Sequence, residues 1–308
     1  MKLKIGSRGS KLAVAQAEWV GGLIRRANTD VDIEFVRIVT TGDRETGAPL
    51  QAMGGKGVFV KEIEEALLFK QIDLAVHSLK DVPQALPSGL RLGPCPQRED
   101  VRDVVISRFG ELLRELPKGS TIGTGAPRRL AQIRRAHWKR AYRLEPIRGN
   151  VDTRLQKVRD GKYDAIILAA AGLKRLGLEG EITEYLEPGD MMPAPCQGSL
   201  GLELREDRPD LLSLLETIKH PESDIAARAE RAFLQGLGGD CNVPVAAYSV
   251  VVGKTLVMKA MLLDPTGEKS VASAQDGLAS EPELVGGQLA ERVLYDGGTE
   301  LLIPPPVV

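Results

Sequence analysis

The sequence predicts an α/β protein made of two β/α domains and a smaller α+β third domain. Short apolar runs alternate with amphipathic helical stretches twice along the chain, which is typical of parallel-sheet units. Two segments without periodicity, a charged one at 98–102 and a Pro-rich one at 188–195, separate the two series. The last ninety or so residues change to a long helix followed by alternating strands. A length of 308 residues also exceeds what one small core needs.

The two crossings indicate that the chain leaves the first domain, builds the second and returns. We therefore expect domain 1 to comprise residues 1–98 and 197–218, domain 2 residues 99–196, and domain 3 residues 219–308. No internal repeat of fixed period is visible in any of them.

The first series begins with a strand and an amphipathic helix whose apolar residues share one stripe. Its strands are expected at Leu3–Gly6, Val31–Val39, Ile72–Val76 and Leu90–Leu92, and its helices at Lys11–Arg26 and Phe59–Lys70. Residues 40–57 are rich in Gly and lack periodicity, so we expect a mobile loop there.

The second series follows the same pattern with shorter elements. Its strands are expected at Val104–Ile106, Thr121–Gly123, Arg143–Ile147 and Ala165–Leu168, and its helices at Leu112–Leu116, from Pro127, and from Asn150 to Gly161. After the second crossing we expect a strand at Ser199–Leu204. In the third domain we expect a helix over Pro221–Leu237, strands at Val245–Val252 and Thr255–Leu263, and a helix over Glu281–Leu294.

Composition and charge exclude several functions. A net charge of -1 argues against nucleic-acid binding through bulk positive charge. The longest nearly apolar stretch, Ala165–Leu173, is too short to span a bilayer, and the first residues lack the apolar core of a secretory signal. Three widely spaced cysteines give neither a disulfide framework nor a CxxC metal spacing, so we expect a cytoplasmic protein without a metal site.

Three turns between a strand and a helix carry arginine. They are Arg8-Gly9-Ser10-Lys11, Pro127-Arg128-Arg129 and Arg148–Arg154. A cation in the first turn of a helix opposes the helix dipole by about 0.3–1 kcal/mol, and the sequence shows no benefit in the folded state that would offset this. An anionic ligand would supply one, since arginine binds carboxylates and phosphates in bidentate fashion. The turns therefore predict an anion-binding crevice.

A fourth turn brings an acid to the same predicted crevice. The run Ala75–Pro83 ends a buried strand in a polar tip that carries His77, Lys80 and Asp81. An ionised carboxylate among arginines can steady a transient cation or accept and return a proton. Asp81 therefore suits a substrate with an anionic periphery and a reacting centre that becomes cationic, whereas His77 is interpreted as a hydrogen-bonded structural residue.

Seven motifs together resemble the porphobilinogen deaminase family over essentially the whole chain. They are Ser7–Ala13, Gly54–Phe59, His77–Pro83, Arg148–Arg154, Ala169–Gly177, Pro193–Gly198 and Gly238–Pro244. The resemblance implies two domains like those of periplasmic binding proteins with the active cleft between them, and a third domain that bears a cysteine. It also implies a transferase that joins four porphobilinogen molecules, releases ammonia at each step, and finally releases hydroxymethylbilane by hydrolysis.

The resemblance further assigns the cofactor and the site. It implies a dipyrromethane cofactor held on Cys241 through a thioether, and Asp81 as acid/base and cation stabiliser. Positions that would bind cofactor or substrate are Arg8, Ser10, Ser78, Lys80, Thr124, Arg128, Arg129, Arg148, Arg154, Arg175 and Gln197, with Lys56 and Phe59 in a lid loop. Two departures concern Gly125-Ala126-Pro127, where the family usually has Ser-Ser-Leu, and Cys196, where it usually has Gly.

The same arginines leave one alternative open from another class, a non-enzymatic two-domain protein that binds small anions. The two classes differ in mass, because the enzyme carries an adduct on one cysteine. Under either interpretation we expect a monomer that binds a small molecule and neither nucleic acid nor membrane.

Overall fold

The computed structural model describes residues 1–40, 60–136, 141–238 and 243–302. The chain divides into two compact units, and each is described by itself. Unit 1 comprises Met1–Glu99 and Gly198–Asp224, and unit 2 comprises Asp100–Gln197 and Ile225–Val308. None of the described helices is long and apolar enough to cross a membrane.

Unit 1 contains a five-stranded sheet with the order β2-β1-β3-β10-β4. The strands are β1 (Lys2–Arg8), β2 (Asp32–Ile38), β3 (Leu74–Ser78), β4 (Leu90–Leu92) and β10 (Leu200–Arg205). Strand β1 pairs in parallel with β2 and β3, whereas β10 runs antiparallel to β3 and β4. The strands of the first series, β1 to β4, therefore run in the same direction as expected, whereas β10, whose direction was not predicted, runs the opposite way. Strand β10 enters directly from the second crossing, so no helical crossover forces it to run parallel.

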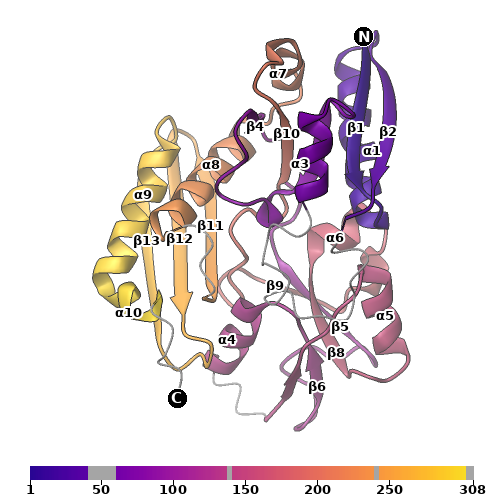
Figure 1. The fold of residues 1–308 in the computed structure, drawn as a ribbon. Coiled ribbons are helices and arrows are strands. Elements are labelled where there is room, and N and C mark those ends of the chain that lie inside the picture. Colours follow the sequence, from indigo (N-terminus) through magenta and orange to yellow (C-terminus); the bar gives the residue numbers. More distant parts are fainter. Residues whose placement is uncertain (41–59, 137–140, 239–242, 303–308) are drawn as a thin grey trace. The chain divides into compact units, whose positions relative to one another are not determined.

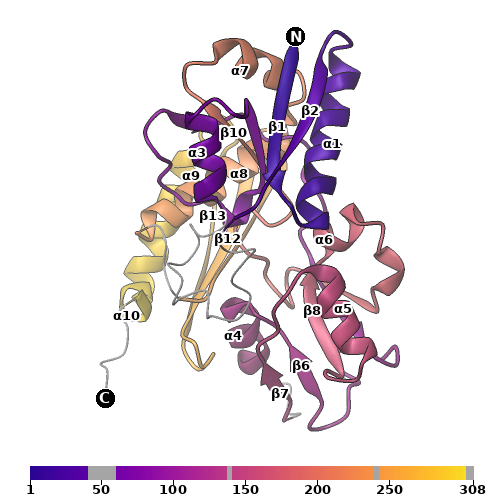
Figure 2. The ribbon, with the colours of Figure 1, turned by 45° about the vertical axis from the view of Figure 1, so that its right-hand side comes forward.

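Helices cover both faces of this sheet. Helix α1 (Lys11–Ala27) and helix α7 (Pro209–Glu216) pack on one face, where Leu74 and Val76 point. Helix α3 (Lys61–Leu68) packs on the other face against Ala75. Figure 2 shows α1 lying along β1 and β2. Alternate residues of β3 thus enter different cores, which explains why its sequence is an unbroken apolar run.

Unit 2 contains a second five-stranded sheet with the same topology, in the order β7-β6-β8-β5-β9. The strands are β5 (Asp103–Ser107), β6 (Thr121–Gly123), β7 (Arg143–Glu145), β8 (Ala165–Ala169) and β9 (Glu184–Leu186). Strand β6 is parallel to β7 and β8, while β5 is antiparallel to β8 and β9. Helices α5 (Val151–Arg159) and α6 (Ala170–Arg175) adjoin one core, and α4 (Pro127–Arg135) adjoins the other.

The remainder of unit 2 is a three-stranded antiparallel sheet in the order β11-β12-β13. Its strands are β11 (Val245–Val252), β12 (Thr255–Leu263) and β13 (Ser270–Leu278), and Figure 1 shows α9 (Pro282–Val293) beside them. Helix α8 spans Pro221–Gly236, and its first residues belong to unit 1. Helices α8 and α9 share a core with β12. After α9 the chain forms η4 (Leu294–Gly298) and α10 (Thr299–Leu302). This third sheet, together with α8 and α9, corresponds to the smaller α+β part of the chain that the sequence predicted.

Most expected elements form close to their expected bounds. The α/β fold class is confirmed, with two five-stranded mixed sheets and a smaller three-stranded sheet packed on helices. The elements that were not expected include α6, α7, β9, β13, the short helix η3 (Glu179–Glu181), η4 and α10. The expected helix at Leu112–Leu116 is only a turn, in which the Leu112 carbonyl accepts from the Glu115 and Leu116 N–H groups. The expected loop at residues 40–57 lies, beyond Thr40, outside the described residues.

Candidate active site

In unit 1, the acid predicted as catalytic follows the carboxyl end of β3. Strands β1 and β3 are parallel neighbours with Gly6 opposite Ala75, so their carboxyl ends share one edge of the sheet. Arg8 is the last residue of β1, and the 3-10 helix η2 (Leu79–Asp81) begins directly after β3. Ligands of open α/β sheets bind at this kind of edge. The structure therefore brings Arg8, Lys80 and Asp81 to one edge of unit 1.

The short helix η2 presents Asp81 to solvent from a buried base. Leu79 and Val82 on either side of it are buried, whereas Asp81 is exposed and Lys80 is half-buried. The Leu79 N–H donates to the Ser199 carbonyl at 3.0 Å, and the Val82 N–H donates to the Leu79 carbonyl at 3.2 Å. The anchored turn thus holds an accessible carboxylate at a defined position.

Two serines near this edge have local roles. Ser10 is the N-cap of α1, and its Oγ accepts from the Ala13 N–H at 3.2 Å. Ser78 Oγ accepts from Gln16 Nε2 at 3.0 Å, which ties α1 to the end of β3. The hydroxyl is the acceptor in both bonds, so its proton can still be donated to a ligand.

A buried cluster of two acids and a histidine lies behind the Lys80–Asp81 turn. His77 Nε2 is 2.9 Å from Glu203 Oε2, and Glu203 is fully buried. This contact confirms that His77 is a hydrogen-bonded structural residue. Glu64 on α3 is also buried, and burial, followed by the charge of Glu203, raises its pKa to about 7 despite the opposing effect of His77.

The raised pKa of Glu64 predicts a pH dependence of stability. Because the folded-state pKa lies above the unfolded value of 4.5, the unfolded chain loses this proton first, and the free energy of unfolding falls as the pH rises from about 4.5 to about 7. A difference of this size corresponds to at most about 3 kcal/mol. Glu64→Gln has no carboxyl proton to release, so this variant should not show the fall in stability. The thermal midpoint of the variant should therefore rise relative to that of the wild type as the pH increases from 5 to 8.

The exposed Glu18 on α1 provides the control for this comparison, because it does not contribute to the pKa of Glu64. Glu18→Gln should keep a constant offset from the wild type across the same pH range. An equally constant offset for Glu64→Gln would contradict the raised pKa.

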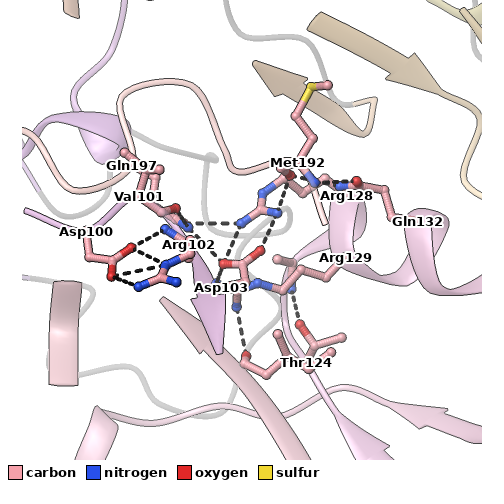
Figure 3. Close-up of polar contacts among 12 residues, drawn as sticks. Asp100, Val101, Arg102, Asp103, Thr124, Arg128, Arg129, Gln132, Met192 and Gln197 are labelled. Carbon is pink, nitrogen blue, oxygen red and sulfur yellow. Dashed lines mark hydrogen bonds and ion pairs between the residues drawn. The ribbon is translucent and has the colours of Figure 1, made fainter. Parts of the chain in front are cut away.

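In unit 2, three predicted side chains, those of Arg128, Arg129 and Gln197, form one buried network around Asp103 (Figure 3). Arg128 donates to Asp103 from both Nη atoms, at 2.6 and 3.0 Å, and to the Met192 carbonyl at 2.8 Å. Arg129 donates to Asp103 Oδ1 at 2.7 Å and to the Ile167 carbonyl at 2.8 Å. Gln197 Nε2 also donates to Asp103 Oδ1, at 2.8 Å.

This network corrects one expectation from the sequence. Asp103 supplies the folded-state benefit that the Pro127-Arg128-Arg129 turn appeared to lack, because the start of β5 lies beside the carboxyl end of β8. Burial alone would raise the pKa of Asp103, but the charges and hydrogen bonds of the two arginines outweigh it and hold that pKa well below its usual range. The ion pairs bridge residues far apart in sequence, so no local pattern revealed them.

The two arginines are not completely occupied by Asp103. Arg129 Nε is buried and has no hydrogen-bond partner within the part of the chain that the structure describes. Two guanidinium groups face a single carboxylate, so the pair keeps one excess positive charge in a buried place. Such a group favours an additional acceptor with negative charge.

Removing the charge of Asp103 should destabilise unit 2. Asp103→Asn leaves two buried guanidinium groups without a counter-ion, and breaking a buried ion pair in this way removes about 3–5 kcal/mol of stability. Asp190→Asn is the control, because Asp190 pairs with Arg114 at 2.8 Å in an exposed ion pair whose loss changes stability by about 0–1 kcal/mol. Urea denaturation of both variants measures the difference, and equal midpoints would contradict the assigned role of Asp103.

Thr124 and the Gly125-Ala126-Pro127 departure lie beside this network. Thr124 is fully buried, and its Oγ1 accepts from the Ala126 N–H at 3.3 Å. A Cβ at position 125 would lie 3.0 Å from the Ile147 carbonyl oxygen, which is tighter than ordinary contact. Glycine thus fits the local backbone here, and Ala126 is the N-cap of α4 and makes no side-chain cap hydrogen bond.

Three further arginines predicted to bind the ligand lie in unit 2, and each of them is half-buried. Arg148 precedes α5, and its carbonyl accepts from Lys157 Nζ at 2.9 Å. Arg154 Nε donates to the Gly149 carbonyl at 2.8 Å, and Arg175 ends α6. Because β6 lies between β7 and β8, the segments that follow these parallel strands meet at one edge. The arginines of unit 2 therefore lie on segments that leave the sheet at the same edge.

The cysteines differ in what the structure shows. Cys95 and Cys196 are both buried, and burial raises the pKa of the Cys95 thiol to about 11. Cys241, Lys56 and Phe59 lie outside the described residues. Among the residues with described positions, no group of three or more His, Cys, Asp or Glu side chains could hold a metal ion.

Comparison with known proteins first defines the class. Residues 3–213 match the family described as "Porphobilinogen deaminase, dipyromethane cofactor binding domain", and residues 225–295 match "Porphobilinogen deaminase, C-terminal domain". The chain is therefore a cofactor-dependent transferase with a separate C-terminal domain.

The relatives identify the family. Porphobilinogen deaminase from Geobacter metallireducens is 45% identical over 301 residues, covering 98% of this chain and 94% of its own length. The protein of the same name from Roseiflexus castenholzii is 45% identical over 300 residues, covering 97% and 98%. The chain belongs to the porphobilinogen deaminase family. It uses a dipyrromethane cofactor and makes hydroxymethylbilane from porphobilinogen, which decides against the non-enzymatic alternative.

Among solved structures, the chain is similar to the periplasmic aliphatic sulphonate binding protein SsuA from Escherichia coli. The sequence identity is 16% and the TM-score 0.40, with 77% of this chain and 72% of that chain covered. The fold described above depends on the order of the strands and not on this likeness.

Proposed function

We propose that Asp81 is the catalytic residue of the deaminating condensation. Departure of ammonia from porphobilinogen leaves a methylene-pyrrolenine cation, and a carboxylate beside it lowers the energy of the developing charge. When the next carbon–carbon bond forms, the attacked pyrrole carbon loses a proton, which the same carboxylate can accept. The observation that supports this role is the exposed Asp81 on an anchored turn, at the same sheet edge as Arg8 and Lys80.

We propose that Cys241 carries the cofactor through a thioether. The other two thiols are poor candidates, because Cys95 and Cys196 are 4% and 1% exposed and the thiolate of Cys95 is disfavoured by its raised pKa. The dipyrromethane supplies the primer on which the tetrapyrrole grows. Its carboxylates fit the excess positive charge of Arg128 and Arg129, and the unpartnered Arg129 Nε is a donor that such a carboxylate would satisfy.

We propose that the remaining polar positions hold the acetate and propionate groups of the growing chain. Each pyrrole brings two carboxylates, so six pyrroles, including the cofactor, present twelve. The proposed set comprises Arg8, Ser10, Ser78, Lys80, Thr124, Arg148, Arg154, Arg175 and Gln197. Gln197 and Thr124 are fully buried, so any contribution from them passes through the arginine network beside them.

Arg148→Leu tests this carboxylate-binding role. The fold should survive, since Arg148 is half-buried in a turn, and the loss of one charge-assisted contact should weaken binding by about 1.5–3 kcal/mol. Mass spectra should then show an altered distribution of enzyme-bound intermediates. Arg159→Leu is the matched control, because Arg159 ends the same helix, α5, in an exposed ion pair with Glu181. Wild-type intermediates in both variants would contradict the proposed role.

Further proposals concern organisation. We propose three domains, at 1–98 with 197–218, 99–196 and 219–308, and a lid loop that contains Lys56 and Phe59. We also propose a cytoplasmic monomer that binds no nucleic acid or membrane. Three widely spaced cysteines suit a reducing compartment, and light scattering would test the monomer.

A further inference from the structure

A buried carboxylate on α8 joins three separate segments of unit 2. Glu230 is fully buried, and its Oε2 accepts from the Cys196 N–H at 2.5 Å. Its Oε1 accepts from the Ser249 N–H at 2.9 Å and from the Ser249 hydroxyl at 2.7 Å. Three donors converge on one side chain, so the site requires an acceptor-only group at position 230.

The bond from Cys196 acts on an unusual backbone conformation. Cys196 has a φ of 61°, in the left-handed region that suits glycine, which explains why the related family usually has glycine here. A residue with a side chain pays about 1–2 kcal/mol for this conformation. A charge-assisted bond to Glu230 compensates for that energy and fixes the direction in which the chain continues.

The next residue, Gln197, is part of the arginine network. Its Nε2 donates to the Val101 carbonyl at 2.8 Å and to Asp103 at 2.8 Å, and its Oε1 accepts from Arg128 Nη2 at 3.2 Å. Gln197 is fully buried, so it cannot turn towards solvent if its backbone moves. A continuous series of contacts therefore leads from the C-terminal segment through Cys196 to Asp103 and the arginines.

We propose that Glu230 is a positioning residue for the Arg128–Arg129 pair. It fixes the Cys196 backbone and, through it, the Gln197 amide, so that both arginines keep the orientation needed for an anionic ligand. The inference rests on the proposed function of the arginines as carboxylate binders. It also links the C-terminal domain, to which Glu230 belongs, with the cofactor-binding domain matched at residues 3–213.

A double-mutant cycle tests this inference. The variants are Glu230→Gln, Gln197→Ala and the double variant, compared by kcat/KM for porphobilinogen per cofactor-loaded molecule, with loading measured by intact mass. If Glu230 acts through Gln197, kcat/KM should fall about tenfold in each single variant. In the double variant, kcat/KM should fall no further than in the worse single variant. Ser249→Ala is the control, because it removes one bond to Glu230 but leaves the Cys196 contact, and its kcat/KM should stay within about twofold of the wild type.

Two outcomes would overturn the inference. One is a double variant whose loss is the product of the single losses. The other is an unchanged kcat/KM in Glu230→Gln with a fall in thermal midpoint like that of Ser249→Ala. If Glu230→Gln does not fold, Glu230→Asp carries the same comparison, because it keeps the charge but shortens the reach to Cys196. A wild-type protein without added mass would instead contradict the proposed cofactor attachment.

Discussion

Asp81→Asn is expected to lower turnover by about 10²–10⁴-fold through the loss of proton transfer alone. Asparagine is nearly isosteric, so the η2 turn, with Leu79 and Val82 buried on either side, should keep its shape. The amide has no charge to oppose the methylene-pyrrolenine cation, and loss of this electrostatic contribution could add a comparable factor. Substrate affinity should fall less, because arginines carry the carboxylate recognition.

Asp81→Glu is the matched variant. It keeps the charge but moves it by about one methylene, and misplacement of this kind reduces the rate on the order of 10²-fold. Steady-state kinetics of both variants, after mass spectrometry has confirmed equal cofactor loading, gives the comparison. Equal turnover with Asn and Glu would mean that the charge at this turn does not drive the reaction.

Cys241→Ser should abolish activity completely while leaving the fold intact. A serine hydroxyl is a far weaker nucleophile than a thiolate at neutral pH, so no adduct should form and no primer would be present. The purified variant should have the mass of its sequence, and porphobilinogen turnover should be undetectable.

Cys196→Gly is the control for this loss. Glycine suits the φ of 61° at this position and keeps the N–H that donates to Glu230. This variant should therefore retain both the adduct and the activity. An adduct that persists in Cys241→Ser, or disappears in Cys196→Gly, would assign the attachment to another thiol.

The sequence predicted the bounds of short strands best where glycines lie close to both ends of the strand, as at Leu90–Leu92 and Thr121–Gly123. It missed β13, in which small and polar residues such as Ser273 and Gln275 replace the apolar alternation of a half-buried strand. It also missed the direction of β5 and β10, because strand direction depends on how the chain enters a sheet and leaves no local signal.

The site shows the same division between local and long-range information. The turn that carries Asp81 is a local feature, and the apolar strand before it predicted its place. The network around Asp103 is not local, because Arg128 and Gln197 reach it from positions 25 and 94 residues away. Glu230 was missed for the same reason, since a single glutamate in an amphipathic helix resembles any solvated residue until its partners are known.

Intact mass and peptide mapping of the purified wild-type protein test the central claim most directly. The claim is that this chain works with a primer bound covalently to one cysteine. It predicts a mass above that of the sequence by one dipyrromethane, with the added mass on the peptide that contains Cys241. A mass equal to that of the sequence alone, or an adduct on the peptide with Cys95 or Cys196, would contradict it.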